Sequence, residues 1–164
     1  MITELEMEVL EILSEDARTS AERIAVMTGK TEKEIETVVR SLEEQNILLK
    51  YPAMVNWDKV DREMVEALIE VRVTPQRDEG FDAIAEKIYR YEEVSSVYLM
   101  SGGYDLLVTV RGRSMKQTAL FVAEKLSTIE NVLSTATHFK LKTYKEAGVI
   151  YDERRSDQRL AVTP

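Results

Sequence analysis

The sequence contains no cysteine and only one histidine, and each shortage removes a class of chemistry. Without cysteine the chain can form neither a disulfide scaffold nor a thiolate metal site, and it has no cysteine nucleophile. His138 alone cannot build a histidine metal cluster within one chain, and no G-x-S-x-G segment places a serine nucleophile in the chain. We therefore expect a protein that is not an enzyme and needs no metal or cofactor, with His138 on a strand beside a polar neighbour.

Long apolar runs are also missing. Runs such as Ile47–Leu49 and Leu106–Val108 fall far short of the ~20 apolar residues that a membrane-spanning helix needs. The first residues, Met1–Glu4, have neither the basic nor the apolar stretch of a secretory signal. With 44% hydrophobic and 32% charged residues, the composition is typical of globular proteins, so we expect a cytoplasmic protein without a membrane partner.

Basic residues are outnumbered, because 22 Lys and Arg face 30 Asp and Glu and the net charge is −8. Contacts to phosphate groups need Lys and Arg, so this charge argues against general affinity for nucleic acid. Any DNA contact has to come from a few well-placed residues.

The first 55 residues contain three segments with apolar side chains at helical spacing. Helices are predicted there over residues 5–13, 21–27 and 32–45. Ser20 is a good N-cap for the second helix, and Thr31 with Glu34 forms a capping box for the third. Residues 47–55 then suggest a short extended hairpin, or wing.

The second and third of these helices can cross closely. A helix-turn-helix needs a small residue in its first helix, a glycine in the turn and branched apolar residues in its second helix. Ala25, Gly29, Ile35 and Val38 supply these residue types at suitable spacing. Two ordinary helices of a small bundle remain the alternative. Together with the wing, the pattern predicts a winged helix-turn-helix DNA-binding domain over residues 1–55.

The second half of the chain has a different periodicity. Alternating apolar and polar residues predict strands over residues 65–74, 94–101, 105–111 and 132–142. Helical spacing follows Phe81 and again follows the N-cap Ser114. The order β-α-β-β-α-β is that of a ferredoxin-like domain over residues 65–145, so the fold class is α+β. Helices cover only one face of such a sheet, and we expect a partner subunit to cover the other.

Two segments lie outside these domains. Residues 56–64 are polar with scattered apolar anchors, and we interpret them as a linker whose Trp57 and Val60 dock against the protein. Residues 146–164 form a C-terminal tail, which adds an edge strand or reaches across a dimer.

The combination of the two domains resembles the Lrp/AsnC family of feast/famine regulators, from about Glu4 to Lys145. The segments that carry the resemblance are Asp16–Ser20, Arg40–Glu43, Ser101–Asp105 and Val132–Thr137. The resemblance implies a sequence-specific transcription regulator that binds operator DNA as a dimer, through its recognition helix. It also implies that the ferredoxin-like domain is of the RAM type, that dimers assemble into tetramers or octamers, and that a small effector, an amino acid, controls this assembly.

The chain departs from the family on the recognition helix, where the family often has extra arginines and a proline. Those places hold Val38, Ser41 and Glu32 here. Residues 1–50 contain twelve acidic and six basic residues, so the half that reads DNA is the more acidic half. We therefore expect one dimer to bind DNA weakly and with strong salt dependence, and oligomerisation to raise the affinity.

Several polar residues of the third helix and its flanks remain to contact DNA. The candidates are Lys30, Thr31, Lys33, Thr37, Arg40, Ser41 and Lys50. Arg40 is the best candidate for a guanine edge because its planar guanidinium donates two parallel hydrogen bonds. Lys30 and Lys50 would flank it on phosphates. For Lys30 and Lys33, an ordinary solvated surface charge explains the residue equally well.

The resemblance places an effector pocket at the central hairpin of the second domain. The candidates are Ser101, Gly102, Gly103, Tyr104, Asp105, Thr135 and Thr137. A plain two-residue turn with positive φ explains both glycines without a ligand. In the functional interpretation, bare backbone amides approach a carboxylate and Asp105 accepts from an α-ammonium group. The family pattern G-D-x-D is G-G-Y-D here, so an amino acid would lose one anchor.

Two other functions compete with a DNA-reading regulator. The acidic first half favours an adaptor that senses metabolites or pairs with family members but has little DNA binding of its own. A small enzyme on a ferredoxin-like scaffold is the other rival, since fold alone does not decide function. For that rival the sequence offers no phosphate-binding glycine loop ahead of a helix.

Overall fold

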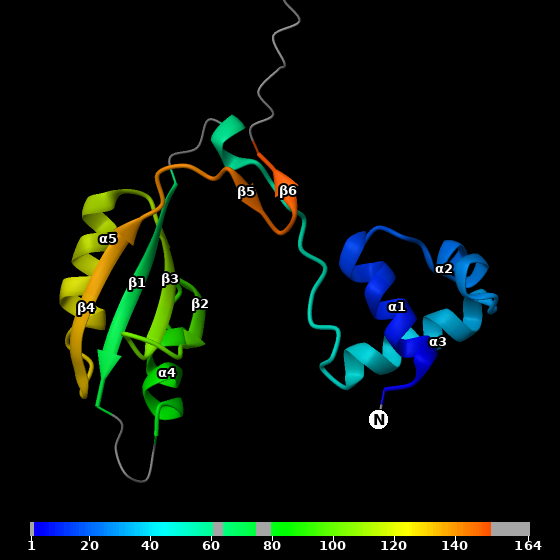
Figure 1. Cartoon of the computed structure of the whole chain (residues 1–164), viewed down its shortest axis with the longest axis horizontal. Helices are drawn as coiled ribbons and strands as arrows, with labels where there is room; N and C mark the ends of the chain where they lie inside the picture. Colours follow the sequence, from blue (N-terminus) through cyan, green and yellow to red (C-terminus); the bar gives the residue numbers. More distant parts are fainter. Residues whose placement is uncertain (1, 61–63, 75–79, 152–164) are drawn as a thin grey trace, which may run out of the picture. The chain divides into compact units, whose positions relative to one another are not determined.

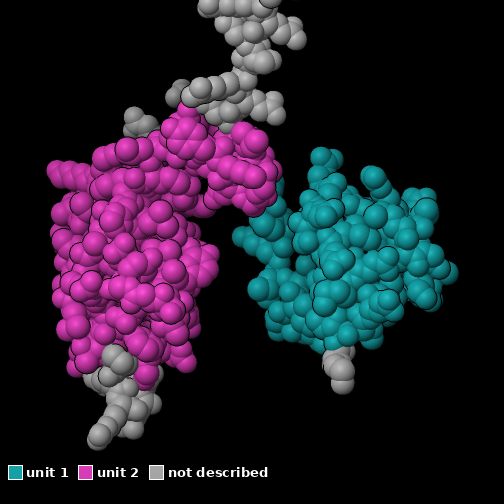
Figure 2. Space-filling model, viewed as in Figure 1, with its two compact units in different colours: residues 1–55 teal, residues 56–164 magenta. Residues whose placement is uncertain are grey.

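The computed structural model describes residues 2–60, 64–74 and 80–151, and it divides into two compact units, residues 1–55 and 56–164 (Figure 2). Part of the predicted linker, at residues 61–63, and most of the predicted tail, from residue 152 onward, lie outside the described residues.

The first unit consists of three helices around one small core (Figure 1). They are α1 (Glu4–Glu15), α2 (Ala21–Thr28) and α3 (Glu32–Glu44). Their buried apolar residues are Val9, Leu13, Ile24, Ala25, Ile35 and Leu42. As predicted, Ser20 accepts a hydrogen bond from the backbone of Arg23, and Thr31 and Glu34 form a reciprocal capping box at α3. Each helix thus begins where the sequence supplies a side-chain acceptor.

The predicted close crossing of α2 and α3 is confirmed. Ala25 is 5% exposed and Ile35 is fully buried, while Val38 packs against the same core. Gly29 ends α2 with a φ of 67°, a left-handed conformation that glycine adopts without steric cost. The two helices therefore form a helix-turn-helix.

The predicted wing is wrong, because none of residues 47–55 lies in a strand. The amides of Ile47 and Leu48 both donate to the carbonyl oxygen of Leu42, at 2.9 and 3.1 Å, and so close the last turn of α3. Pro52 has no N–H to donate to a ladder. With these donors used or missing, the segment forms no strand.

The second unit contains a four-stranded antiparallel sheet in the order β2-β3-β1-β4. Its strands are β1 (Val65–Val73), β2 (Val94–Leu99), β3 (Leu106–Gly112) and β4 (Val132–Phe139). Its helices are η1 (Trp57–Lys59), α4 (Asp82–Tyr89) and α5 (Met115–Phe121), which continues as the π-helical turn η2 (Val122–Leu126). From β1 to β4 the order is β-α-β-β-α-β, so the predicted ferredoxin-like fold is confirmed.

Helices α4 and α5 cover the same face of the sheet. Every second residue of β1, from Ala67 to Val73, is buried, and those from Ile69 onward share one core cluster with Ile84 and Ile88 of α4. The core continues into Phe121, Val122 and Leu126 of α5 and η2. The opposite face of the sheet, called the open face below, has no helix against it in the described part of this unit.

The described part of the tail forms a hairpin of its own. Strands β5 (Lys145–Glu146) and β6 (Val149–Ile150) pair with each other and not with the main sheet, so the expected edge strand is not formed by the described residues of the tail, 146–151. The Asn56 side-chain amide donates to the carbonyl oxygen of Tyr151 at 3.4 Å, so the hairpin contacts the start of the predicted linker. No helix in the described ranges is long and apolar enough to cross a bilayer.

Candidate functional site

Helix α3 presents one polar face away from the core of its unit. Ile35 and Leu42 point inward and are fully buried. Lys33, Thr37 and Arg40 recur at intervals of four and three residues on the opposite side, and all three are exposed. The fold therefore brings three of the seven predicted DNA contacts to a single accessible face.

All three predicted hydroxyl contacts already have hydrogen-bond partners, and the Thr37 hydroxyl donates to the carbonyl oxygen of Lys33 at 2.8 Å. The Thr31 hydroxyl donates to Glu34 Oε2 at 2.7 Å and accepts from the Glu34 backbone at 3.3 Å. Ser41 is half-buried, and its Oγ accepts from the Gln45 side chain at 2.9 Å. Lys30 and Lys50 are exposed on either side of the helix in sequence.

Helix α3 is strongly acidic, with five glutamates and two basic residues and hence a net charge of −3. Glu32 and Glu34 lie in its first turn, where a negative charge stabilises the helix dipole. Hydrogen bonds from the backbone N–H and then the hydroxyl of Thr31 hold the pKa of Glu34 below its usual range. These charges help the helix to form, but they oppose the approach of phosphate groups.

Tyr51 and Glu43 form a contact that sequence reasoning missed. The phenol of Tyr51 donates to Glu43 Oε1 at 2.8 Å, although the two residues are eight positions apart. No spacing rule signals such a pair, because the contact depends on how residues 47–55 fold back after α3.

The loop between β2 and β3 differs from the predicted two-residue turn. Residues 100–105 connect these strands, and neither Gly102 nor Gly103 has a positive φ. A Cβ atom added to either glycine would meet nothing within 4 Å. The expected conformational reason for the two glycines is therefore wrong, and packing supplies no other. Their exposed backbone remains open to a ligand.

Asp105 ties this loop to the end of β1. Its N–H donates to the carbonyl of Val71 at 3.1 Å, and its Oδ2 accepts from the N–H of Val73 at 2.9 Å. Its own carbonyl accepts from Met100 at 2.8 Å. The half-buried carboxylate thus has a structural role and keeps its second oxygen, Oδ1, for another donor.

The remaining predicted effector residues divide into two groups. Ser101 to Gly103 are exposed and Tyr104 is half-buried, all within the loop. Thr135 and Thr137 lie on β4, and β1 separates them from β3. Their partners in β1, Val71 and Ile69, face the helices, and the hydroxyl of Thr135 lies 3.2 Å from that of Ser127. The two threonines therefore face the helix layer, and β1 lies between them and the loop of residues 100–105.

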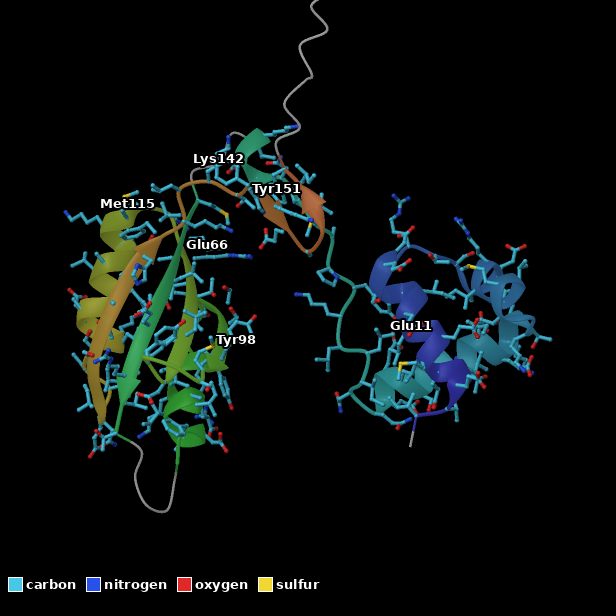
Figure 3. All side chains as sticks on the ribbon, viewed as in Figure 1. Glu11, Glu66, Tyr98, Met115, Lys142 and Tyr151 are labelled. Carbon is cyan, nitrogen blue, oxygen red and sulfur yellow. The ribbon has the colours of Figure 1, made fainter. Side chains whose placement is uncertain are left out.

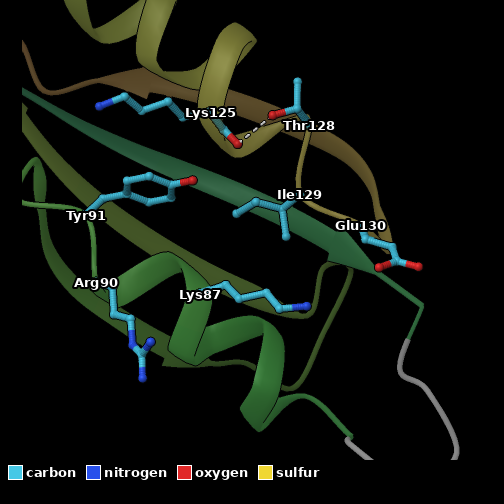
Figure 4. Close-up of a pocket in the computed structure, with 7 residues that line it drawn as sticks. All are labelled: Lys87, Arg90, Tyr91, Lys125, Thr128, Ile129 and Glu130. Atoms are coloured by element: carbon cyan, nitrogen blue, oxygen red, sulfur yellow. Dashed lines mark hydrogen bonds between the residues drawn. The ribbon is translucent and has the colours of Figure 1, made fainter.

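A shallow groove of about 430 Å³ runs between α4 and η2 (Figure 4). It is lined by Lys87, Arg90, Tyr91, Lys125, Thr128, Ile129 and Glu130, and by none of the predicted effector residues. Lys125 pairs with Glu93 at 2.7 Å and Arg90 pairs with Glu86, so two of its three cations are already neutralised. The groove is therefore a weak site for an anion.

Charged groups on the open face form a connected network. Glu66, labelled in Figure 3, accepts from Arg111 at 3.0 Å and pairs with Lys140. Burial raises the pKa of Glu66, but the hydrogen bonds from Lys140 and Arg111 outweigh it and hold that pKa below the usual range. The carboxylate is thus ionised at neutral pH and joins β1 to β3 and to Lys140, the residue that follows β4.

Apolar side chains interrupt this network across the middle of the open face. Tyr98, also labelled in Figure 3, is paired in register with Leu107, and it is 55% exposed. Leu68 of β1 pairs in register with Thr109 of β3 and with His138 of the edge strand β4. The Nε2 atom of His138 lies 3.3 Å from Oε1 of Glu70 in β1. His138 is thus a strand residue with a polar neighbour, as predicted. The open face combines exposed apolar surface with paired charges.

Comparison with known proteins gives one consistent answer. Residues 66–150 match the Lrp/AsnC ligand binding domain. Over 164 residues the chain is 50% identical to an uncharacterised HTH-type transcriptional regulator, YugG, of Bacillus subtilis strain 168, and the alignment covers 99% of each chain. It is 24% identical over 144 residues to a proline dehydrogenase transcriptional activator of Rhizobium radiobacter, covering 88% of this chain and 92% of that one.

Solved structures show the same fold. AsnC of Escherichia coli superposes with a TM-score of 0.67 at 22% identity and covers 93% of this chain and 99% of its own. The transcriptional regulator NMB0573 of Neisseria meningitidis, in complex with L-methionine, has a TM-score of 0.69 at 20% identity. That match covers 89% of this chain and 94% of the other.

Proposed function

The chain belongs to the Lrp/AsnC family of DNA-binding transcription regulators, and on this basis we propose that α3 reads an operator while the second unit binds a small effector and joins subunits. The relatives are regulators and not enzymes, which agrees with the expectation from composition. The proposal includes a cytoplasmic location and DNA reading that uses no metal or cofactor.

The exposed face of α3 carries the proposal. Arg40 offers a planar fork to the O6 and N7 atoms of a guanine, and Lys33 and Thr37 lie beside it on the same face. We assign Lys30 and Lys50, which are both exposed, to phosphate contacts. The buried helix-turn-helix core supports this role, because it holds α3 rigidly by its opposite side.

The open face supports self-association. Tyr98, Leu68 and Leu107 leave apolar surface on a sheet face that no helix covers among the described residues. A second copy would cover it and place two α3 helices on one duplex. Because α3 has a net charge of −3, each helix binds weakly, and a dimer or higher oligomer raises the affinity through avidity.

The loop at residues 100–105 supports effector binding. Neither glycine is needed for a turn or for close packing, so their exposed amides are available to a carboxylate. Asp105 Oδ1 can accept from an α-ammonium group. The complex of NMB0573 with L-methionine shows that a protein of this fold binds an amino acid, which supports this ligand class.

DNA reading is tested by sequencing the genomic fragments that the purified protein retains at two salt concentrations. We expect a shared motif at low salt, and a loss of affinity with a slope of about −0.9 per phosphate contact as salt rises. An amino acid panel added to the same assay would reveal the effector. Fragments without a shared motif, or no retained fragments at low salt, would instead support the acidic adaptor that the charge of α3 favours.

Asp105→Asn is expected to abolish the ligand-induced change in oligomer size and to leave the fold intact. Asparagine keeps an oxygen acceptor for the Val73 amide but removes the charge that an ammonium group needs. Asp105→Ala is less suitable, because an unpaired half-buried amide costs about 1–3 kcal/mol. Light scattering with and without the amino acid measures the change. A variant that still responds would remove Asp105 from the pocket.

A further inference from the structure

A groove of about 360 Å³ lies on one flank of α3, where α1 and α2 meet it. Leu13 and Ile24 line its apolar part, while Arg40, Glu43 and Tyr51 contribute its polar groups. Tyr51 reaches this groove from the segment after α3, which folds back towards the helix because the Leu42 carbonyl accepts from the amides of Ile47 and Leu48. The groove therefore joins a predicted DNA contact to a residue that sequence reasoning did not select.

The phenol of Tyr51 remains a hydrogen-bond donor at physiological pH. Burial, the hydrogen bond to Glu43 and the charge of that carboxylate raise the pKa of Tyr51 to about 12. The phenol thus stays protonated at neutral pH and donates to Glu43 Oε1 at 2.8 Å. One carboxylate of the acidic helix is held by a neutral donor and not by a cation.

Arg40 has three carboxylates within reach along its own helix. Glu36 precedes it by four residues, and Glu43 and Glu44 follow it by three and four, which are the spacings at which helical side chains meet. Among the residues that the structure describes, none of the three forms an ion pair with Arg40. A carboxylate that did so would compete with DNA for the guanidinium group.

We propose that Tyr51 is a positioning residue for DNA reading, which holds the carboxylate of Glu43 on the flank of α3 and so leaves Arg40 available to the duplex. This role rests on the proposed contact between Arg40 and DNA. It assigns the segment after α3 a part in recognition, although that segment forms no wing. Glu36 lines the same groove, but no hydrogen bond from Tyr51 to it is present, so it provides a matched control.

The test compares the DNA affinity of full-length variants on a retained fragment. Tyr51→Phe is expected to weaken binding about 2- to 5-fold, since a released carboxylate pairs with Arg40 in both helices of a dimer. Adding Glu43→Gln to Tyr51→Phe should restore the affinity, because the amide has no charge to offer. Glu36→Gln should change the affinity by the same factor whether Tyr51 or Phe is present.

A purely structural role predicts a different pattern. Tyr51→Phe would then weaken binding equally with Glu43 or Gln at position 43, and that outcome would overturn the proposal. An unchanged affinity in Tyr51→Phe would overturn it too. Thermal unfolding of each variant shows whether residues 1–55 remain folded. The single variants Glu43→Gln and Glu36→Gln keep the phenol of Tyr51, so their unfolding temperatures are the reference for the Tyr51→Phe variants.

A titration that does not involve DNA checks the pair directly. Tyrosinate absorbance should show a transition near pH 12 that disappears in Tyr51→Phe and moves to lower pH in Glu43→Gln. Since the pKa is raised in the folded state, the associated stability is present below about pH 10 and is lost as the pH rises towards 12. An unmoved transition in Glu43→Gln would exclude the pair. If the pair is intact but Arg40→Ala leaves DNA affinity unchanged, the proposed reader fails and this role with it.

Discussion

Replacing Ile35 with alanine is expected to lower the free energy of unfolding of residues 1–55 by about 2–5 kcal/mol and to abolish operator binding. Ile35 is fully buried where α3 meets α1 and α2, and alanine would leave a cavity among the five other buried apolar side chains of this core. A unit of this size has a total stability of roughly 3–8 kcal/mol, so such a loss consumes much of it.

Hydrogen exchange measured by mass spectrometry separates this effect from changes elsewhere in the chain. In Ile35→Ala, amides of α1, α2 and α3 should exchange faster, while those of the main sheet keep their protection. Glu36→Ala is the matched control, since its side chain is exposed and its effect should stay within about 0.5 kcal/mol. Unchanged protection of α3 in Ile35→Ala would show that the crossing of α2 and α3 does not stabilise the unit.

Arg40→Ala is expected to weaken specific operator binding by about 1–3 kcal/mol, or roughly 5- to 150-fold, and to relax the preference at one base pair. The loss is this large because a good bidentate contact to guanine contributes about 1–3 kcal/mol of discrimination against the wrong base. Lys33→Ala should differ in kind. It should weaken binding to all sequences and lower the salt slope by about one.

Arg90→Ala is the charge-matched control for Arg40→Ala. Arg90 is the C-cap residue of α4 in the second unit, is exposed and pairs with Glu86, so its removal changes the net charge equally but not the reading face. Fluorescence anisotropy on the retained fragment and on a scrambled duplex measures both affinities. Equal losses in the two variants would mean that Arg40 contributes charge alone.

Positions set by a short stretch of chain could be predicted well. The capping box of Thr31 and Glu34 and the left-handed turn at Gly29 follow from side chains three or four residues apart. Alternation along residues 65–73 likewise identified β1 and its buried face. These features depend on local hydrogen bonds and on side-chain periodicity, both of which are written in adjacent residues.

The candidate site was predicted less completely. The outer face of α3 follows from its inward residues, so Lys33, Thr37 and Arg40 could be grouped from the sequence. The conformation of residues 100–105 could not be predicted from the sequence, because the path of that loop depends on the hydrogen bond from Val73 to the Asp105 side chain. A glycine pair suggests a tight turn by default, and only the fold shows that the turn is wider.

The sequence by itself determined the three helices of the first unit, their crossing and the β-α-β-β-α-β order of the second, because each depends on periodic burial within one segment. Only the tertiary structure decided that residues 47–55 form no wing, that Tyr51 binds Glu43, and that Thr135 and the effector loop lie on opposite sides of β1. The separation of such residues along the chain does not determine how far apart they lie in space, so only the folded structure shows which of them are in contact.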